Sequence, residues 1–170
     1  EQKGAVEKIV NSNKKEFFYL YGLTGSGKTE VFLKAAEKII AEGKAVIYLV
    51  PEIGLTHQVI SAAVKRFGSQ AAVLHSGLTG SERLNQWMRI RRGEALMIVG
   101  ARSAVFAPAE NIGLIIIDEE HDASYKSGSV PRYHARQTAM YLAVKHNCPV
   151  VMGSATPSLE AWNMIQNKKI

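Results

Sequence analysis

The residues from 22 to 29 have the types and spacing of a loop that binds phosphate groups. They read G-x-x-x-x-G-K-T, a pattern in which backbone N–H groups surround the phosphates of a nucleotide. Lys28 can reach the β- and γ-phosphates, and the Thr29 hydroxyl can ligate Mg²⁺. The alternative is a glycine-rich turn that only joins a strand to a helix. The pattern predicts nucleotide contacts from Gly22, Gly25, Ser26, Gly27, Lys28, Thr29 and Glu30.

A second group of chemically capable residues follows an apolar run at 114–117. It consists of Asp118, Glu119, Glu120 and His121. Asp118 would hold Mg²⁺, and Glu119 would polarise an attacking water molecule as a general base. Adjacent acids repel one another unless cations share the site, which favours a functional site over an exposed acidic turn. Glu120 is expected to be a spacer or an ion-pair partner.

The elements that must position these residues follow from alternating apolar runs and amphipathic segments. Runs rich in Val, Ile and Leu predict strands at residues 17–21, 45–50, 71–75, 96–100, 114–118 and 150–153. Helices are expected near residues 30–42, 54–67, 81–92, 134–146 and 158–166. Such apolar strands are typical of a mostly parallel sheet with helices on both faces, the α/β class. Ligands bind such sheets at the carboxyl ends of the strands, so the segments after the strands should gather on one edge.

Length and composition indicate one domain. The 170 residues are 46% hydrophobic and 21% charged, and no apolar run approaches the ~18 residues of a membrane span. We therefore expect no membrane partner. The lone Cys148 excludes an internal disulfide and is expected to be buried and unreactive. The net charge of +6 is compatible with a polyanionic partner but does not require one. Both ends look cut, so we expect residues 1–170 to be a monomeric piece of a longer protein.

Together, the motifs resemble the first motor lobe of superfamily 2 helicases. The motifs are G-x-x-x-x-G-K-T at residues 22–29, D-E-E-H at 118–121 and S-A-T at 154–156. A finer likeness to the bacterial replication-restart helicases spans essentially the whole chain, with P-E-I-G-L-T at 51–56, A-R-S-A at 101–104 and G-S-A-T-P-S at 153–158. The resemblance implies a RecA-like P-loop lobe that uses ATP and Mg²⁺. It implies that the parent is a cytoplasmic DNA helicase of replication restart. Its partners would be single-stranded and forked DNA and other primosome proteins.

The resemblance also assigns roles to single residues. Gln2 corresponds to a glutamine that reads adenine, although it could be a plain exposed polar residue. Thr56, Arg102 and Ser103 correspond to contacts with the backbone of single-stranded DNA, with helix capping and packing as the alternative; hydroxyl and guanidinium groups suit phosphate. The coupling of the nucleotide site to the rest of the lobe would run through His121, Ser154 and Thr156, although His121 could simply fill space.

The segment at 124–134 mixes aromatic and cationic residues with Gly, Ser and Pro, so a mobile loop is expected. It resembles the aromatic-rich loop that couples DNA binding to ATP hydrolysis in these helicases. The alternative is an ordinary solvent loop. Tyr125 and Tyr133 are expected to stack on bases, and phosphates would be met by Lys126, Arg132 and Arg136.

Two further groups of residues have open assignments. One is a group of arginines on or near one helix, which could face DNA or another domain, although a solvated helix face is favoured: Arg83, Arg89, Arg91 and Arg92. The other is the pair Trp87 and Trp162, expected in the core or at an interface between lobes.

The sequence contains no motif of a second motor lobe. We therefore expect the isolated chain to bind ATP and Mg²⁺ weakly and to hydrolyse ATP negligibly. The zinc-binding cysteines of the family are also absent, so zinc is expected only in other parts of the parent. The rival interpretations are another superfamily 2 DNA translocase, a P-loop kinase, which would need an acceptor pocket and a lid, and a non-catalytic nucleotide-binding module.

Overall fold

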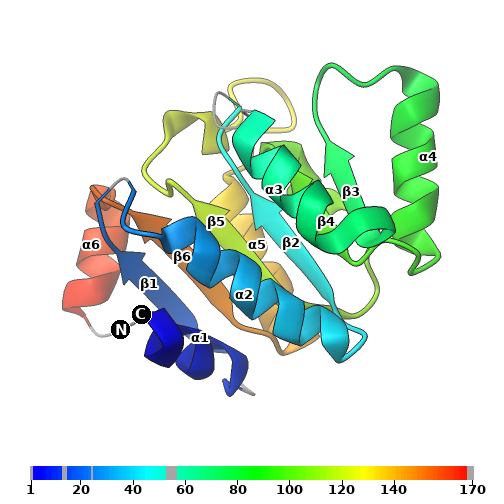
Figure 1. The fold of residues 1–170 in the computed structure, drawn as a ribbon. Helices are drawn as coiled ribbons and strands as arrows, with labels where there is room; N and C mark the ends of the chain where they lie inside the picture. The colour runs from blue at the N-terminus through cyan, green and yellow to red at the C-terminus, as the bar shows by residue number, and fades with distance from the viewer. Residues whose placement is uncertain (1, 13–14, 24, 53–56, 168–170) are drawn as a thin grey trace.

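The computed structural model describes residues 2–12, 15–23, 25–52 and 57–167 (Figure 1). These residues form a six-stranded sheet in the order β1-β6-β5-β2-β4-β3, in which every neighbouring pair is parallel. The strands are β1 Phe17–Tyr21, β2 Ala45–Leu49, β3 Ala71–Leu74, β4 Met97–Gly100, β5 Ile112–Asp118 and β6 Val150–Ser154. The helices are α1 Gln2–Val10, α2 Lys28–Ala41, α3 His57–Phe67, α4 Gly80–Arg91, α5 Ala135–His146 and α6 Leu159–Gln166.

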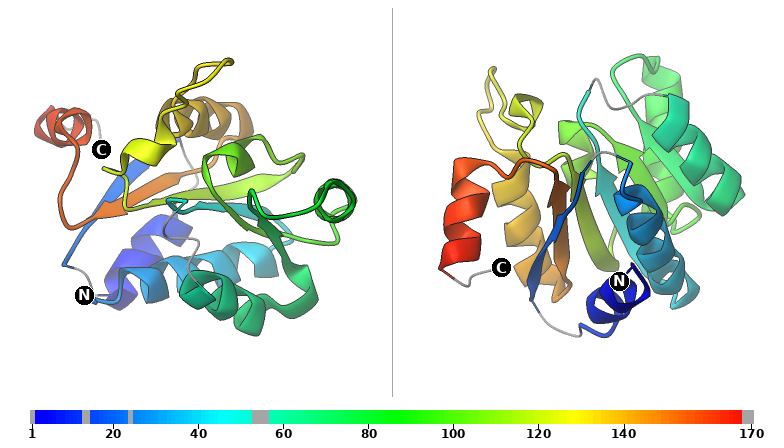
Figure 2. Two further views of the ribbon diagram at one scale, coloured as in Figure 1. Left: turned by 90° about the horizontal axis from the view of Figure 1, so that it is seen from above. Right: turned by 60° about the vertical axis from the view of Figure 1, so that its left-hand side comes forward.

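Helices cover both faces of this sheet (Figure 2). One face packs against α1, α2 and α3, and the other against α5 and the short 3₁₀ helix Arg102–Phe106. Both faces of the sheet are apolar because side chains alternate between the two layers along each strand, as in β5. Leu114 and Ile116 face the α2 layer, whereas Ile115 and Ile117 face the α5 layer. Continuous apolar strands therefore form a sheet that is buried on both sides.

The predicted α/β class and all of the predicted strands are confirmed. The parallel register places Asp118 beside Gly153 and Tyr21 beside Ser154. The residues that follow the strands therefore share one edge of the sheet, as expected. The predicted start of the helix at 54 falls on residues 53–56, which lie outside the described residues. The helix α1 was not predicted, although Val6 and Ile9 are buried against α2.

Several predictions for individual side chains can be compared with their exposure. Cys148 is buried, as predicted. Trp87 and Trp162 are 38% and 50% exposed, so they do not belong to the core, and the other predicted place, an interface between lobes, stays a prediction. Both lie on helices whose inner faces are filled by smaller side chains. Of the four arginines on or next to α4, Arg83, Arg91 and Arg92 are exposed, while Arg89 donates to the carbonyl oxygens of Ser69 and Ala71. No helix in the described ranges has the length and apolar character to span a membrane.

Candidate functional site

The phosphate-type loop connects β1 to α2 and folds tightly around its own backbone. Gly25 and Gly27 have φ angles of 82° and 88°, a left-handed region that residues with a Cβ rarely adopt. A Cβ on Gly22 would lie 2.6 Å from the Ser26 hydroxyl oxygen. The glycines at these positions therefore allow a turn that most other residues would form only with strain.

Lys28 is the first residue of α2, and its side chain is buried within this loop. Its Nζ donates to the carbonyl oxygens of Gly22, at 2.7 Å, and Leu23, at 3.2 Å. The same nitrogen lies 3.8 Å from Oε1 of Glu119, across the space between the loop and the end of β5. The structure thus brings together the two sequence motifs that were predicted to form one site.

Asp118 ends β5 with its carboxylate buried. The Tyr48 hydroxyl donates to its Oδ2 at 2.8 Å, and the Glu119 backbone N–H donates to its Oδ1 at 3.0 Å. The pKa of Asp118 is raised, because burial raises it more than the hydrogen bond from Tyr48 lowers it. Sequence reasoning missed Tyr48, for which a tyrosine inside an apolar run was the only signal.

Both predicted ligands of Mg²⁺ border the Tyr48 hydroxyl, which also interacts with the Thr29 side chain. Within the described residues, no group of three or more His, Cys, Asp or Glu is arranged to hold a metal ion by itself. Magnesium typically binds one or two protein groups together with substrate phosphates and water. A buried carboxylate and a hydroxyl next to a phosphate-type loop fit that requirement.

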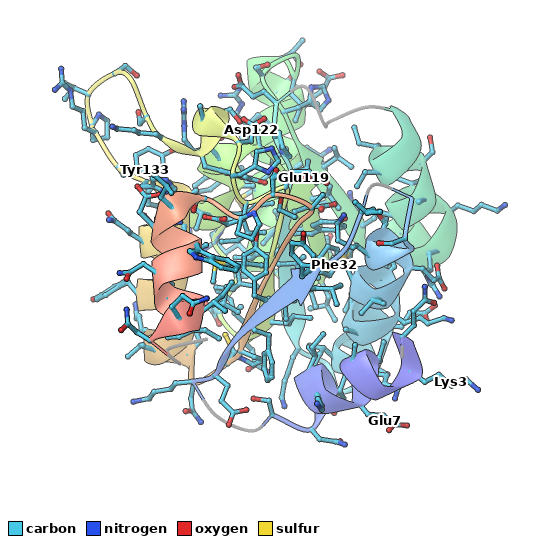
Figure 3. All side chains as sticks on the ribbon, turned by 90° about the vertical axis from the view of Figure 1, so that its left-hand side faces the viewer. Lys3, Glu7, Phe32, Glu119, Asp122 and Tyr133 are labelled. Carbon is cyan, nitrogen blue, oxygen red and sulfur yellow. The ribbon has the colours of Figure 1, made fainter. Side chains whose placement is uncertain are left out.

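Glu119 directly follows β5 and lies at the carboxyl edge of the sheet (Figure 3). It is close to residues that were predicted to couple the site. Its Oε2 is 3.3 Å from Oγ of Ser154 and 3.6 Å from Nδ1 of His121. The His121 Nδ1 and the Ser154 Oγ are 2.6 Å apart, and the Thr156 N–H donates to the same Oγ at 3.0 Å. The structure therefore places His121, Ser154 and Thr156 in one hydrogen-bonded group with the predicted general base.

Gln2 reaches the loop from α1, while Lys3 and Glu7 on the same helix point away from the sheet (Figure 3). The Gln2 side-chain amide donates to the Ser26 carbonyl oxygen at 3.1 Å. Beside it lies a cavity of about 460 Å³, lined in part by Gln2, Tyr21, Gly22 and Lys28. This volume falls in the range of small-molecule sites. The position of Gln2 suits the predicted contact with a base.

Within the segment 124–134, the structure contradicts the predicted base-stacking role of Tyr125. Tyr125 is fully buried, and its hydroxyl lies 2.6 Å from the Asp118 carbonyl oxygen and 3.1 Å from that of Leu49. Because its ring has no exposed face, the prediction that Tyr125 stacks on bases is wrong for this structure. The prediction that Arg136 meets phosphates is also wrong, because Arg136 is buried in an ion pair with Glu120. Glu120 is thus an ion-pair partner, one of its two predicted roles.

The other predicted DNA contacts are arranged around Arg102. Its Nη1 donates to the carbonyl oxygens of Ser124 and Lys126 at 2.7 and 2.8 Å, and its guanidinium lies 5.8 Å from the centre of the Tyr133 ring. Arg102 therefore fixes the segment that follows Asp122, and this part of its guanidinium is already occupied. The side chains that remain exposed on this surface are Ser103, Lys126 and Arg132, with Tyr133 half-buried. Thr56 lies outside the described residues.

The sequence as a whole matches one family of known proteins. Residues 1–165 match the model of the DEAD/DEAH box helicase family. The chain belongs to this family. The fold agrees, since the structure of RecG bound to a three-way DNA junction superposes with a TM-score of 0.64 and 22% identity. That alignment covers 96% of this helicase lobe and 21% of the other chain.

Two curated relatives of this DEAD/DEAH box lobe share a name. Replication restart protein PriA of Treponema pallidum is 62% identical over 162 residues, which cover 95% of this chain and 25% of the relative. Replication restart protein PriA of Bacillus subtilis is 53% identical over 169 residues, with coverage of 98% and 21%. The chain therefore spans a quarter or less of the length of these relatives.

Proposed function

We propose that the chain is the ATP-binding first motor lobe of an ATP-dependent DNA helicase that acts in replication restart. The observation that carries this proposal is the approach of Lys28 to Glu119. An ammonium group that faces both a phosphate-type loop and a carboxylate suits a γ-phosphate placed between a charge-stabilising cation and a general base. The 62% identity to a replication restart protein supports the finer assignment over another superfamily 2 translocase.

Each residue of the site has a defined task in this proposal. The loop N–H groups and Lys28 bind the phosphates, and Gln2 contacts the base. Thr29 and Asp118 would hold Mg²⁺, which supplies neutralisation of phosphate charge when it is bound. Glu119 accepts the proton of the attacking water molecule. Ser154 lies within hydrogen-bonding distance of the Glu119 carboxylate and keeps it facing Lys28.

The partners of the parent protein are part of the same proposal. The exposed side chains Ser103, Lys126 and Arg132 supply hydroxyl and cationic groups for the backbone of single-stranded DNA. The names of the relatives and the junction bound by RecG support forked DNA as a substrate. Primosome proteins would be further partners. The bacterial relatives are consistent with a cytoplasmic parent. The proposal also includes that residues 1–170 form a single, monomeric lobe and that any zinc is bound elsewhere in the parent.

ATP hydrolysis by the full-length parent, with and without single-stranded DNA, tests this function. Wild type should show DNA-stimulated hydrolysis, and Lys28→Ala should lower kcat by about 10²–10³-fold because the transition state loses a buried cation. Lys38→Ala is the matched control, because Lys38 lies exposed on the same helix. DNA-independent hydrolysis would argue against a motor. Nucleotide binding without hydrolysis in wild type would favour a non-catalytic module.

A further inference from the structure

A buried ion pair that the proposed chemistry does not use lies next to the general base. Glu120 directly follows Glu119, and Arg136 lies in the first turn of α5. Nη1 of Arg136 donates to Oε1 of Glu120, and the two side chains are 7% and 0% exposed. The same Nη1 donates to the Ser158 hydroxyl at 2.9 Å. A single nitrogen of the guanidinium therefore makes both contacts.

Ser158, the N-cap residue of α6, connects Glu120 to that helix through hydrogen bonds. Its hydroxyl donates to Oε1 of Glu120 at 2.8 Å, and its backbone N–H lies 3.3 Å from Oε2. The same hydroxyl caps α6 by accepting from the Ala161 N–H at 3.1 Å. The Glu120 backbone N–H donates to the Gly153 carbonyl oxygen at 3.0 Å. Glu120 is thus held by β6, α5 and α6 together.

Glu119 needs such support because its backbone is in a left-handed conformation. Its φ angle is 45°, a value that is uncommon for residues other than glycine. Strained conformations of this kind persist only where the surrounding contacts determine them. Asp118 is fixed on one side by hydrogen bonds from Tyr48 and from the Glu119 N–H. Glu120 is fixed on the other side, so Glu119 is a single strained residue between two anchored neighbours.

The ion pair is poorly explained by stability alone. Removing two charges from water costs much of what their attraction gains, and well-packed apolar residues often replace such pairs without loss of stability. We propose that Glu120, Arg136 and Ser158 are positioning residues that hold Glu119 in its left-handed conformation and aim its carboxylate at the attacking water. This inference rests on the proposed function, since it assigns a role in the same hydrolysis.

The test is to substitute Arg136 in the full-length parent and to measure kcat and KM of DNA-stimulated ATP hydrolysis for each variant. Arg136→Met should lower kcat by about 10- to 100-fold, because a general base displaced by an ångström loses that much. KM for ATP should stay within about twofold, since phosphate and base contacts are unchanged. Arg136→Lys should recover most of kcat, because one nitrogen makes both contacts. The control Ala143→Gly, buried in the same helix, should lower the unfolding temperature and leave kcat unchanged.

The outcomes separate the positioning role from a structural one and from the proposed function. If Arg136→Met lowers the unfolding temperature as Ala143→Gly does but leaves kcat unchanged, the pair is structural and the inference is overturned. If Arg136→Met does not fold, the comparison of Ser158→Ala with Ser158→Thr decides, because only the alanine variant loses the hydroxyl and should lose kcat. Absence of DNA-stimulated hydrolysis in wild type would overturn the proposed function, and the positioning role with it.

Discussion

At the scale of single residues, the charge state of the carboxylates at the end of β5 depends on neighbours from distant parts of the sequence. In the proposed function Asp118 must be ionised to hold Mg²⁺, yet burial raises its pKa. The hydrogen bond from Tyr48 counteracts that effect at Oδ2. Tyr48 thus opposes the effect of burial on the pKa of this proposed metal ligand.

Removing the Tyr48 hydroxyl should therefore change the pH dependence of the enzyme. In Tyr48→Phe the pKa of Asp118 should rise further, and the acidic limb of kcat/KM for ATP hydrolysis by the parent should move to higher pH. Tyr141→Phe is the matched control, because Tyr141 is exposed on α5. The measurement is a pH profile of steady-state hydrolysis for the three proteins. Coincident acidic limbs for wild type and Tyr48→Phe would contradict the role of Tyr48.

The same substitution should affect stability with a defined sign. Because the folded pKa of Asp118 is raised, its contribution to stability is fully present below the unfolded pKa and is lost as pH rises through the folded pKa. Tyr48→Phe raises the folded pKa further and removes the donor to Oδ2, while the Glu119 N–H still donates to Oδ1. We expect a loss of about 1–3 kcal/mol in the free energy of unfolding at neutral pH, and a smaller loss in acid. Urea titrations of wild type and Tyr48→Phe at neutral and at acidic pH measure this difference in the free energy of unfolding.

Cys148 gives a residue-scale prediction outside the site. Burial raises the pKa of its thiol to about 11. Because the thiolate is the reactive form, a disulfide reagent at mildly alkaline pH should react about a hundredfold more slowly than with an unperturbed cysteine. In denaturant, one equivalent of the reagent per chain should react fast. Rapid reaction of the folded chain would show that Cys148 is accessible.

The predicted site residues differ in how much of their role the sequence determines. The tasks of Lys28 and Asp118 follow from local patterns, because a loop and a strand end position them. Tyr125 was predicted to be exposed because it belongs to a Gly-, Ser- and Pro-rich segment. Its burial depends on the carbonyl oxygens of Leu49 and Asp118, and the Leu49 contact lies 76 residues away in the sequence. Contacts at such separations leave no local signal.

At the scale of elements, apolar runs predicted the strands because burial on both faces requires apolar side chains throughout. The helix α1 left a weaker signal, since only Val6 and Ile9 are buried in its nine residues. A short helix of that kind is stabilised by packing rather than by its own propensity. In this structure the packing partner is α2, and α1 carries the Gln2 contact to the Ser26 carbonyl oxygen.

Removing the buried contact of α1 should therefore destabilise the whole lobe. Ile9→Ala should lower the free energy of unfolding by about 2–4 kcal/mol through lost burial and the cavity that remains. Lys8→Ala, at an exposed neighbouring position, should change it by less than about 0.5 kcal/mol. Equilibrium denaturation of both variants provides the comparison. Equal stability of the two would mean that α1 is not an integral part of the fold.

At the scale of the whole molecule, the parallel sheet gathers the loop, the carboxylates and the exposed cations on one edge, where one lobe offers one side of a nucleotide site. Among the described residues, no arginine forms a hydrogen bond or an ion pair with Lys28 or Glu119. In enzymes of this chemistry, an arginine supplied from a second lobe or protein is worth about 10³–10⁵ in kcat. The relatives are about four or more times longer than the part aligned here, so they have room for such a lobe outside it.

The isolated 170-residue chain should consequently bind nucleotide but hydrolyse it very slowly. We expect its kcat to be at least about 10³-fold below that of the full-length parent, because the charge that develops on the γ-phosphate lacks its arginine. Single-stranded DNA should not stimulate it. Titration with a fluorescent ATP analogue would establish binding, and single-turnover hydrolysis would give the rate. DNA-stimulated turnover near that of the parent would show instead that these residues form a complete catalytic site.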